Sequence, residues 1–67
     1  MTGKRKALKV FRVQHDLTQA EMAERIGCGR SNYAQIELGN KNGSQAFWKK
    51  FQTAFDVADE AMWELMK

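Results

Sequence analysis

The chain has 67 residues, which leaves room for one domain, because a chain of about 60 residues buries only about 60% of its unfolded surface. With 43% apolar and 28% charged residues, the composition is that of a folded domain and excludes a disordered tail. No apolar run approaches the roughly 20 residues of a membrane helix or forms an N-terminal signal peptide. We therefore expect one cytoplasmic domain over residues 1–67.

Enzymatic and metal-dependent functions find no support in the residue types. One cysteine, Cys28, excludes an internal disulfide, and together with the single histidine, His15, it falls short of the ligands of a zinc site. Cys28 falls on an apolar position, and the sequence gives His15 no nucleophile or carboxylate constellation. We predict a protein that is not an enzyme, with no catalytic residue, no metal and no cofactor.

Charge is distributed unevenly along the chain, although the net value is only +3. Residues 1–50 carry ten Lys or Arg against four Asp or Glu, whereas residues 51–67 carry one against four. A basic body suits a polyanion such as DNA, because each neutralised phosphate releases condensed counterions. Such an excess also serves solubility alone, so it is weak support by itself.

Apolar residues follow a 3.6-residue period and nowhere alternate as in a half-buried strand, so the fold class is all-α. The period predicts a compact bundle of five short helices. Thr18 and Glu21 have the spacing of a capping box at a helix start, and Gly27 stands where a left-handed cap would end that helix. The predicted helices span residues 4–15, 19–26, 30–37, 45–55 and 59–66.

The predicted helix at residues 45–55 has an apolar stripe, which predicts that this helix forms a wall of the core. On a helical wheel, five of its side chains fall within an arc of about 120°. Core packing explains this stripe without any cofactor. The stripe consists of Phe47, Trp48, Phe51, Ala54 and Phe55.

Residues 19–38 have the spacing of a bihelical unit, with small Ala23 where the backbones would approach and Gly27 in the turn. The wheel of residues 30–37 separates a core face from a free face. On the free face, Arg30 can donate to guanine, Gln35 can both donate to and accept from adenine, and Ser31 can bond to either. A solvated helix face has the same composition, so this interpretation depends on the preceding turn.

The turn and its flanking motifs resemble the Cro and phage-repressor type of helix-turn-helix proteins, the XRE family. The resemblance covers residues 8–57 and is carried by Leu8-Lys9-Val10-Phe11-Arg12, Leu17-Thr18-Gln19-Ala20-Glu21-Met22-Ala23, Gly27 and Ile36-Glu37-Leu38-Gly39. It implies a lambda-repressor-like fold that binds double-stranded DNA through the helix at residues 30–37 and regulates transcription, as a repressor.

The resemblance also assigns roles to residues. It implies base readout by positions of which Arg30, Ser31 and Gln35 can make polar contacts. It implies that Gln19 contacts a phosphate and braces the recognition helix, and that further phosphate contacts fall on Asn40, Lys41 and Asn42.

A structural ion pair between Arg12 and Glu37 is also implied. The spacing agrees, because Arg12 follows Leu8 by four residues and Glu37 follows Tyr33 by four. Both charges thus lie on or beside apolar stripes and need partners there.

Tyr33 departs from the family pattern, in which a β-branched residue or Leu is usual. Its hydroxyl could point outward to a phosphate, or the whole side chain could pack in the core. Gly29 replaces the usual Ser or Thr cap of the recognition helix and removes a side chain that could reach DNA.

The C-terminal segment leaves two structural interpretations open. Its apolar side chains form the interface of a homodimer that reads two half-sites about 34 Å apart, or else Trp63 and Met66 close the monomer core. An alternative function is an antitoxin-like or other protein-binding use of the same fold, in which the C-terminal helix holds a protein partner and DNA binding is secondary. The residues concerned are Val57, Met62, Trp63, Leu65 and Met66.

Overall fold

The computed structural model describes residues 4–67, and this part of the chain consists of helices and connecting segments without a strand. Residues 1–3, which the predicted domain includes, lie outside the described residues. The all-α prediction is confirmed, and the last four helices have the predicted bounds. The helices are α1 (Lys6–Gln14), α2 (Gln19–Ile26), α3 (Arg30–Glu37), α4 (Gln45–Phe55) and α5 (Asp59–Met66).

The first helix is shorter than the predicted range of residues 4–15. It begins after Arg5, whose backbone is not helical (φ −80°, ψ 80°) and whose side chain is buried. At the other end, Asp16 adopts a left-handed conformation with φ 56°, which turns the chain toward α2. Between them, His15 caps the helix and stacks its ring on Phe11, with centroids 4.2 Å apart.

The core lies where the five helices meet, and α4 forms one wall of it as predicted. Phe47, Trp48 and Phe51 of the apolar stripe are buried, and Phe55 is half-buried. Ala54 was placed in that stripe wrongly. It is exposed beside a shallow depression between α2 and α4, because its single methyl group does not reach a neighbouring helix.

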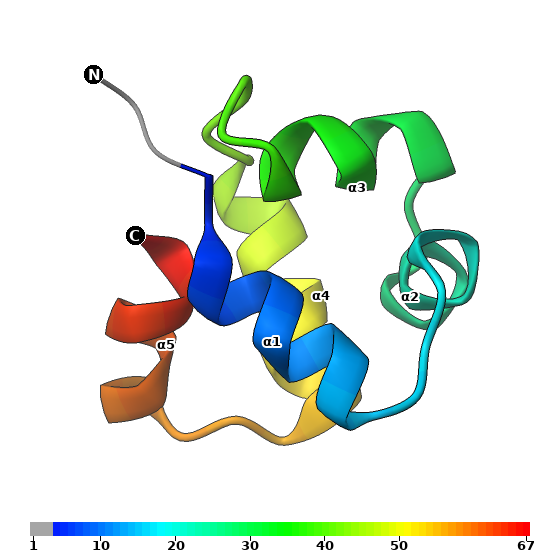
Figure 1. The fold of residues 1–67 in the computed structure, drawn as a ribbon. Helices are drawn as coiled ribbons and strands as arrows, with labels where there is room; N and C mark the ends of the chain where they lie inside the picture. Colours follow the sequence, from blue (N-terminus) through cyan, green and yellow to red (C-terminus); the bar gives the residue numbers. More distant parts are fainter. Residues whose placement is uncertain (1–3) are drawn as a thin grey trace.

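The helices are arranged so that α3 lies along one edge of the molecule. Figure 1 shows α3 in green across the top, and the segment of residues 38–44 returns beside it toward α4. α2 packs against both α3 and α4, and α1 packs against α3 and α5. No helix within residues 4–67 is long and apolar enough to cross a membrane.

Candidate nucleic-acid interface

α2 is held at both ends by the local contacts that the sequence predicts. The hydroxyl of Thr18 accepts from the N–H of Glu21 at 3.1 Å, and the Glu21 carboxylate accepts from the N–H of Thr18 at 2.9 Å, which completes the capping box. Gly27 ends the helix with φ 90°, a conformation that costs glycine little. Its N–H and that of Cys28 both donate to the Ala23 carbonyl, which turns the chain into α3.

α3 has a buried face and an outward face. Tyr33, Ile36 and Glu37 are buried, and they fix the helix against α1, α2 and α4. Arg30 and Ser31 are exposed on the other side, and Gln35 is half-buried there. The structure thus places the three predicted base readers on one helix, on the side away from its buried residues.

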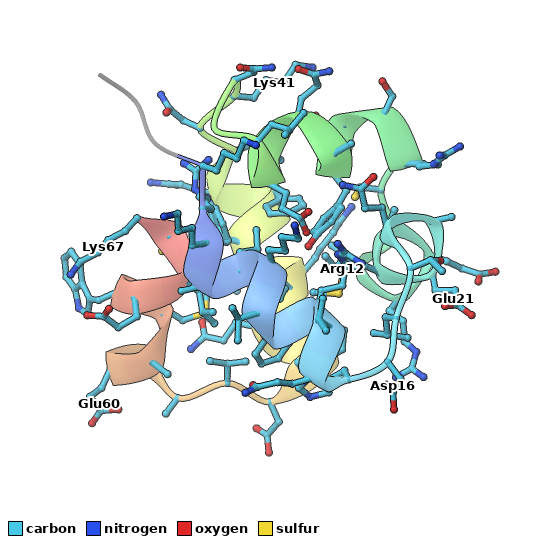
Figure 2. All side chains as sticks on the ribbon, viewed as in Figure 1. Arg12, Asp16, Glu21, Lys41, Glu60 and Lys67 are labelled. Carbon is cyan, nitrogen blue, oxygen red and sulfur yellow. The ribbon has the colours of Figure 1, made fainter. Side chains whose placement is uncertain are left out.

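The structure also brings Arg12 and Glu37 together. Nε of Arg12 lies 2.8 Å from Oε2 of Glu37, and Nη2 lies 3.4 Å from Oε1. Nη1 donates to the Leu17 carbonyl at 2.8 Å, so the same guanidinium holds the connection between α1 and α2. Figure 2 shows Arg12 in the interior between α1, α2 and α3.

Two further donors reach the carboxylate of Glu37, which is only 5% exposed. The Tyr33 hydroxyl donates to Oε2 at 2.6 Å, and the Gln19 amide donates to Oε1 at 3.1 Å. With Arg12, these donors tie α1 and the start of α2 to the end of α3. The alternative in which the Tyr33 hydroxyl points out to a phosphate is wrong, because its side chain is fully buried.

The electrostatics of this cluster keep Glu37 ionised. Burial raises the pKa of Glu37, but hydrogen bonds from Arg12, Tyr33 and Gln19 lower it, and the net direction is downward. Burial and the hydrogen bond to Glu37 raise the pKa of Tyr33. The hydrogen bond to Glu37 raises the pKa of Arg12. The cluster therefore holds a carboxylate, a guanidinium and a neutral phenol across the neutral range.

The segment after α3 carries three predicted phosphate contacts, Asn40, Lys41 and Asn42. All three residues are exposed, and Figure 2 shows Lys41 at the outer edge beside α3. Among the contacts within residues 4–67, Asn40 differs from the other two in having a side-chain partner, because its Nδ2 donates to Oε1 of Gln35 at 2.9 Å. This segment and the outward face of α3 are therefore neighbours on one side of the molecule.

The buried side chain of Arg5 binds the backbone of the segment after α3, a role that sequence reasoning missed. Its Nη1 donates to the carbonyls of Ile36 at 2.7 Å and Lys41 at 2.8 Å, and its Nη2 donates to that of Asn42 at 3.3 Å. The guanidinium lies 5.5 Å from the centre of the Trp48 ring, and Trp48 Nε1 donates to the Asn42 carbonyl.

The same guanidinium reaches α5, since Nε of Arg5 donates to the Met66 carbonyl at 3.0 Å. Burial lowers the pKa of Arg5. No periodic signal could have found this residue, because it precedes its helix and its partners are carbonyls that come from three distant segments.

α5 divides its apolar side chains between the core and the surface. Met62 and Leu65 are buried and belong to the core of the monomer. Trp63 does not close the core, because 74% of it is exposed, and Met66 is 40% exposed. Both line an open groove of about 780 Å³ between α4 and α5, which extends to Asn42 and Gly43 of the segment after α3.

Comparison with known proteins agrees with this geometry. A family model described as helix-turn-helix matches residues 8–60. A relative from Archaeoglobus fulgidus, described as an uncharacterized HTH-type transcriptional regulator, is 31% identical over 68 residues, covering 90% of this chain and 96% of that protein. No solved structure matches the chain significantly. On its sequence and its fold, the chain belongs to the XRE-type helix-turn-helix family of DNA-binding proteins.

Proposed function

We propose that the protein recognises specific sequences in double-stranded DNA by placing α3 in the major groove, and that it represses transcription from the sites it occupies. The outward face of α3, with Arg30, Ser31 and Gln35, is the observation that carries this proposal. An α-helix fits the major groove, where these side chains can bond to base edges. The hydrogen bonds to buried Glu37 fix the same helix from behind, which reduces the cost of ordering it on DNA.

Phosphate contacts on both flanks of α3 would orient it in the groove. Gln19 begins α2 on one flank, and Asn40, Lys41 and Asn42 follow α3 on the other. Phosphate contacts fix register without reading sequence, and they make affinity depend on salt. Action on DNA would place the protein in the cytoplasm.

A homodimer would let the protein read two half-sites about 34 Å apart. The exposed apolar side chains of Trp63 and Met66 support an interface on α5, because aromatic residues and Met are enriched at the centres of interfaces. They lie on α5 and not on α3, although the groove that they line also includes Asn42, one of the predicted phosphate contacts. A bound dimer would repress by covering promoter DNA.

The same exposed side chains favour a second candidate, an antitoxin-like function in which α5 holds a different protein. Glu60 and Glu64 flank Trp63 on exposed positions of this helix, so the partner would present an apolar pocket with basic neighbours. In that case DNA binding would be secondary.

Selection from random double-stranded DNA followed by footprinting tests the main proposal. We expect an enriched, twofold-symmetric site whose half-sites lie one helical turn apart, protected on one face of the duplex. Enrichment of no sequence, or binding that is equal for all sequences, would contradict it. Copurification of a protein partner that abolishes DNA binding would favour the second candidate.

A further inference from the structure

We infer that Arg5 is a positioning residue for DNA binding, which acts through the exposed segment after α3 and does not itself contact DNA. Its guanidinium fixes the backbone of Lys41 and Asn42, and the backbone sets where their side chains meet the duplex. The inference rests on the proposed function, since it assumes that these two residues contact phosphates. It gives a part in DNA binding to a residue that the fold buries.

The donors of Arg5 are almost all engaged inside the protein. A guanidinium carries five N–H donors. Four hydrogen bonds run from it to backbone carbonyls, those of Met66, Ile36, Lys41 and Asn42. Arg5 is only 9% exposed, so a phosphate could bond to it in full only by displacing these carbonyls. Its effect on DNA binding therefore has to pass through the segment that it holds.

The segment depends on Arg5 for its position. Within residues 4–67, the hydrogen-bond donor to the Lys41 carbonyl is Nη1 of Arg5 alone. The Asn42 carbonyl accepts from Nη2 of Arg5 and from Nε1 of Trp48, which occupies both of its lone pairs. Gly43 follows with φ 79°, and a Cβ there would lie 2.8 Å from Nε1 of Trp48. The chain is thus fixed on its inner side by Arg5 and Trp48.

A fixed backbone matters because the two exposed side chains differ in reach. Asn42 carries its amide on a short stem, so a shift of the main chain displaces the amide directly. Lys41 has a long flexible stem that can follow a shift. Loss of Arg5 should therefore remove the Asn42 contact and weaken that of Lys41. Phosphate contacts carry no sequence information, so the loss should be the same for every sequence.

The experiment measures the affinity of the parent and of Arg5→Met for the selected DNA site and for a mismatched site. Binding is compared at several salt concentrations and at a temperature at which both proteins are folded. We expect Arg5→Met to bind both sites about tenfold more weakly, the scale of one hydrogen bond to a charged group. A loss confined to the selected site would contradict the inference.

A variant without the two side chains tests the route of the effect. In a protein that carries Lys41→Ala and Asn42→Ala, the groups through which Arg5 acts are absent. Adding Arg5→Met there should leave the affinity and its salt dependence unchanged. A second tenfold loss in that protein would overturn the inference. If the slope of log affinity against log salt also fell by about one unit, Arg5 would contact a phosphate itself.

Phe55→Ala is the control for lost stability. Phe55 is the last residue of α4, at the opposite end of that helix from the segment, and its ring packs against Phe11 and Phe51. Its removal should lower the melting temperature and leave DNA affinity unchanged. If it weakens binding as much as Arg5→Met does, the effect comes from stability and the inference fails. Should Arg5→Met not fold, Arg5→Lys takes its place, with a smaller expected loss because a charged donor is kept without the planar fork.

The inference and the proposed function fail in different ways. If the parent selects a site, but the variant with Lys41→Ala and Asn42→Ala binds like the parent, the segment does not contact phosphates. The inference then fails, and base readout by α3 stands. If the parent selects no DNA sequence, the proposed function fails and the inference fails with it.

Discussion

The hydroxyl of Tyr33 donates a 2.6 Å hydrogen bond to Oε2 of Glu37, one turn further along the same helix. The pair lies at the centre of the contacts that fix α3, because Arg12 from α1 and Gln19 from α2 reach the same carboxylate. The helix that we propose reads DNA is thus held by its buried face through polar bonds with defined directions, and its outward face is left for other contacts.

Removing this carboxylate should destabilise the fold strongly. Glu37→Ala leaves a guanidinium and a phenol in the interior without their acceptor, and the expected loss is about 3 kcal/mol in the free energy of unfolding. For a domain of this size, that lowers the melting temperature by at least about 12 °C. Glu24→Ala, on an exposed position of α2, is the control. Equal melting temperatures for the two variants would contradict the role of the cluster.

Stability should fall at both ends of the pH scale for reasons located in the same pair. The pKa of Glu37 is lowered from 4.5, so its contribution is complete above that value and is lost as pH falls through the folded-state pKa. The pKa of Tyr33 is raised from 10.0, so its contribution is complete below 10.0 and is lost as pH rises beyond it. Thermal melts across pH should show both limbs, and Tyr33→Phe should weaken the alkaline limb.

Arg5 should contribute more to the stability of the fold than its place near the N-terminus implies. Arg5→Met keeps the apolar stem but leaves the carbonyls of Ile36 and Lys41 without a charged donor, with an expected cost of about 2 kcal/mol. Hydrogen exchange should also accelerate in residues 40–43. Lys6→Met is the matched control, since it removes the same charge from an exposed neighbour. If both variants have the same melting temperature, the hydrogen bonds of Arg5 to these carbonyls add nothing to stability.

Base and phosphate contacts should be separable by mutation. Arg30→Ala is expected to cost about 1–3 kcal/mol of binding and to relax preference at one base pair. Lys41→Ala should weaken all sequences similarly and reduce the slope of log affinity against log salt by about one unit. Binding assays at several salt concentrations with the selected site distinguish the two. Variants that both bind like the parent would contradict the assignment.

The proposed homodimer depends on an exposed tryptophan. Trp63→Ala should convert a dimer to a monomer in sedimentation equilibrium and leave the stability of the monomer within about 0.5 kcal/mol, because Trp63 is on the surface. Met62→Ala, on the buried side of the same helix, should instead cost about 2–5 kcal/mol. A parent protein that sediments as a monomer at tens of micromolar would restrict dimerisation to DNA.

Local patterns in the sequence were sufficient for the helices and for the family. The capping box at Thr18, the turn at Gly27 and the spacing of apolar residues act within a few positions of one another, so a reader of the chain can find them. The first helix was predicted to begin too early, because Arg5, which precedes its first residue, is held by hydrogen bonds to distant carbonyls. Ala54 was wrongly assigned to the core, because a helical wheel gives the direction of a side chain but does not show which residues of other helices lie opposite it.

The sequence by itself determined that the chain is helical, that residues 19–38 form a helix-turn-helix, and which side of α3 is free. Only the tertiary structure decided that Trp63 lies outside the core, that Arg5 fastens the segment after α3, and that Asn40 contacts the Gln35 side chain. The physical reason is the separation along the chain between the residues that interact. Helix formation and capping depend on neighbours along the chain, whereas burial and long-range hydrogen bonds depend on which segments the packed helices bring together.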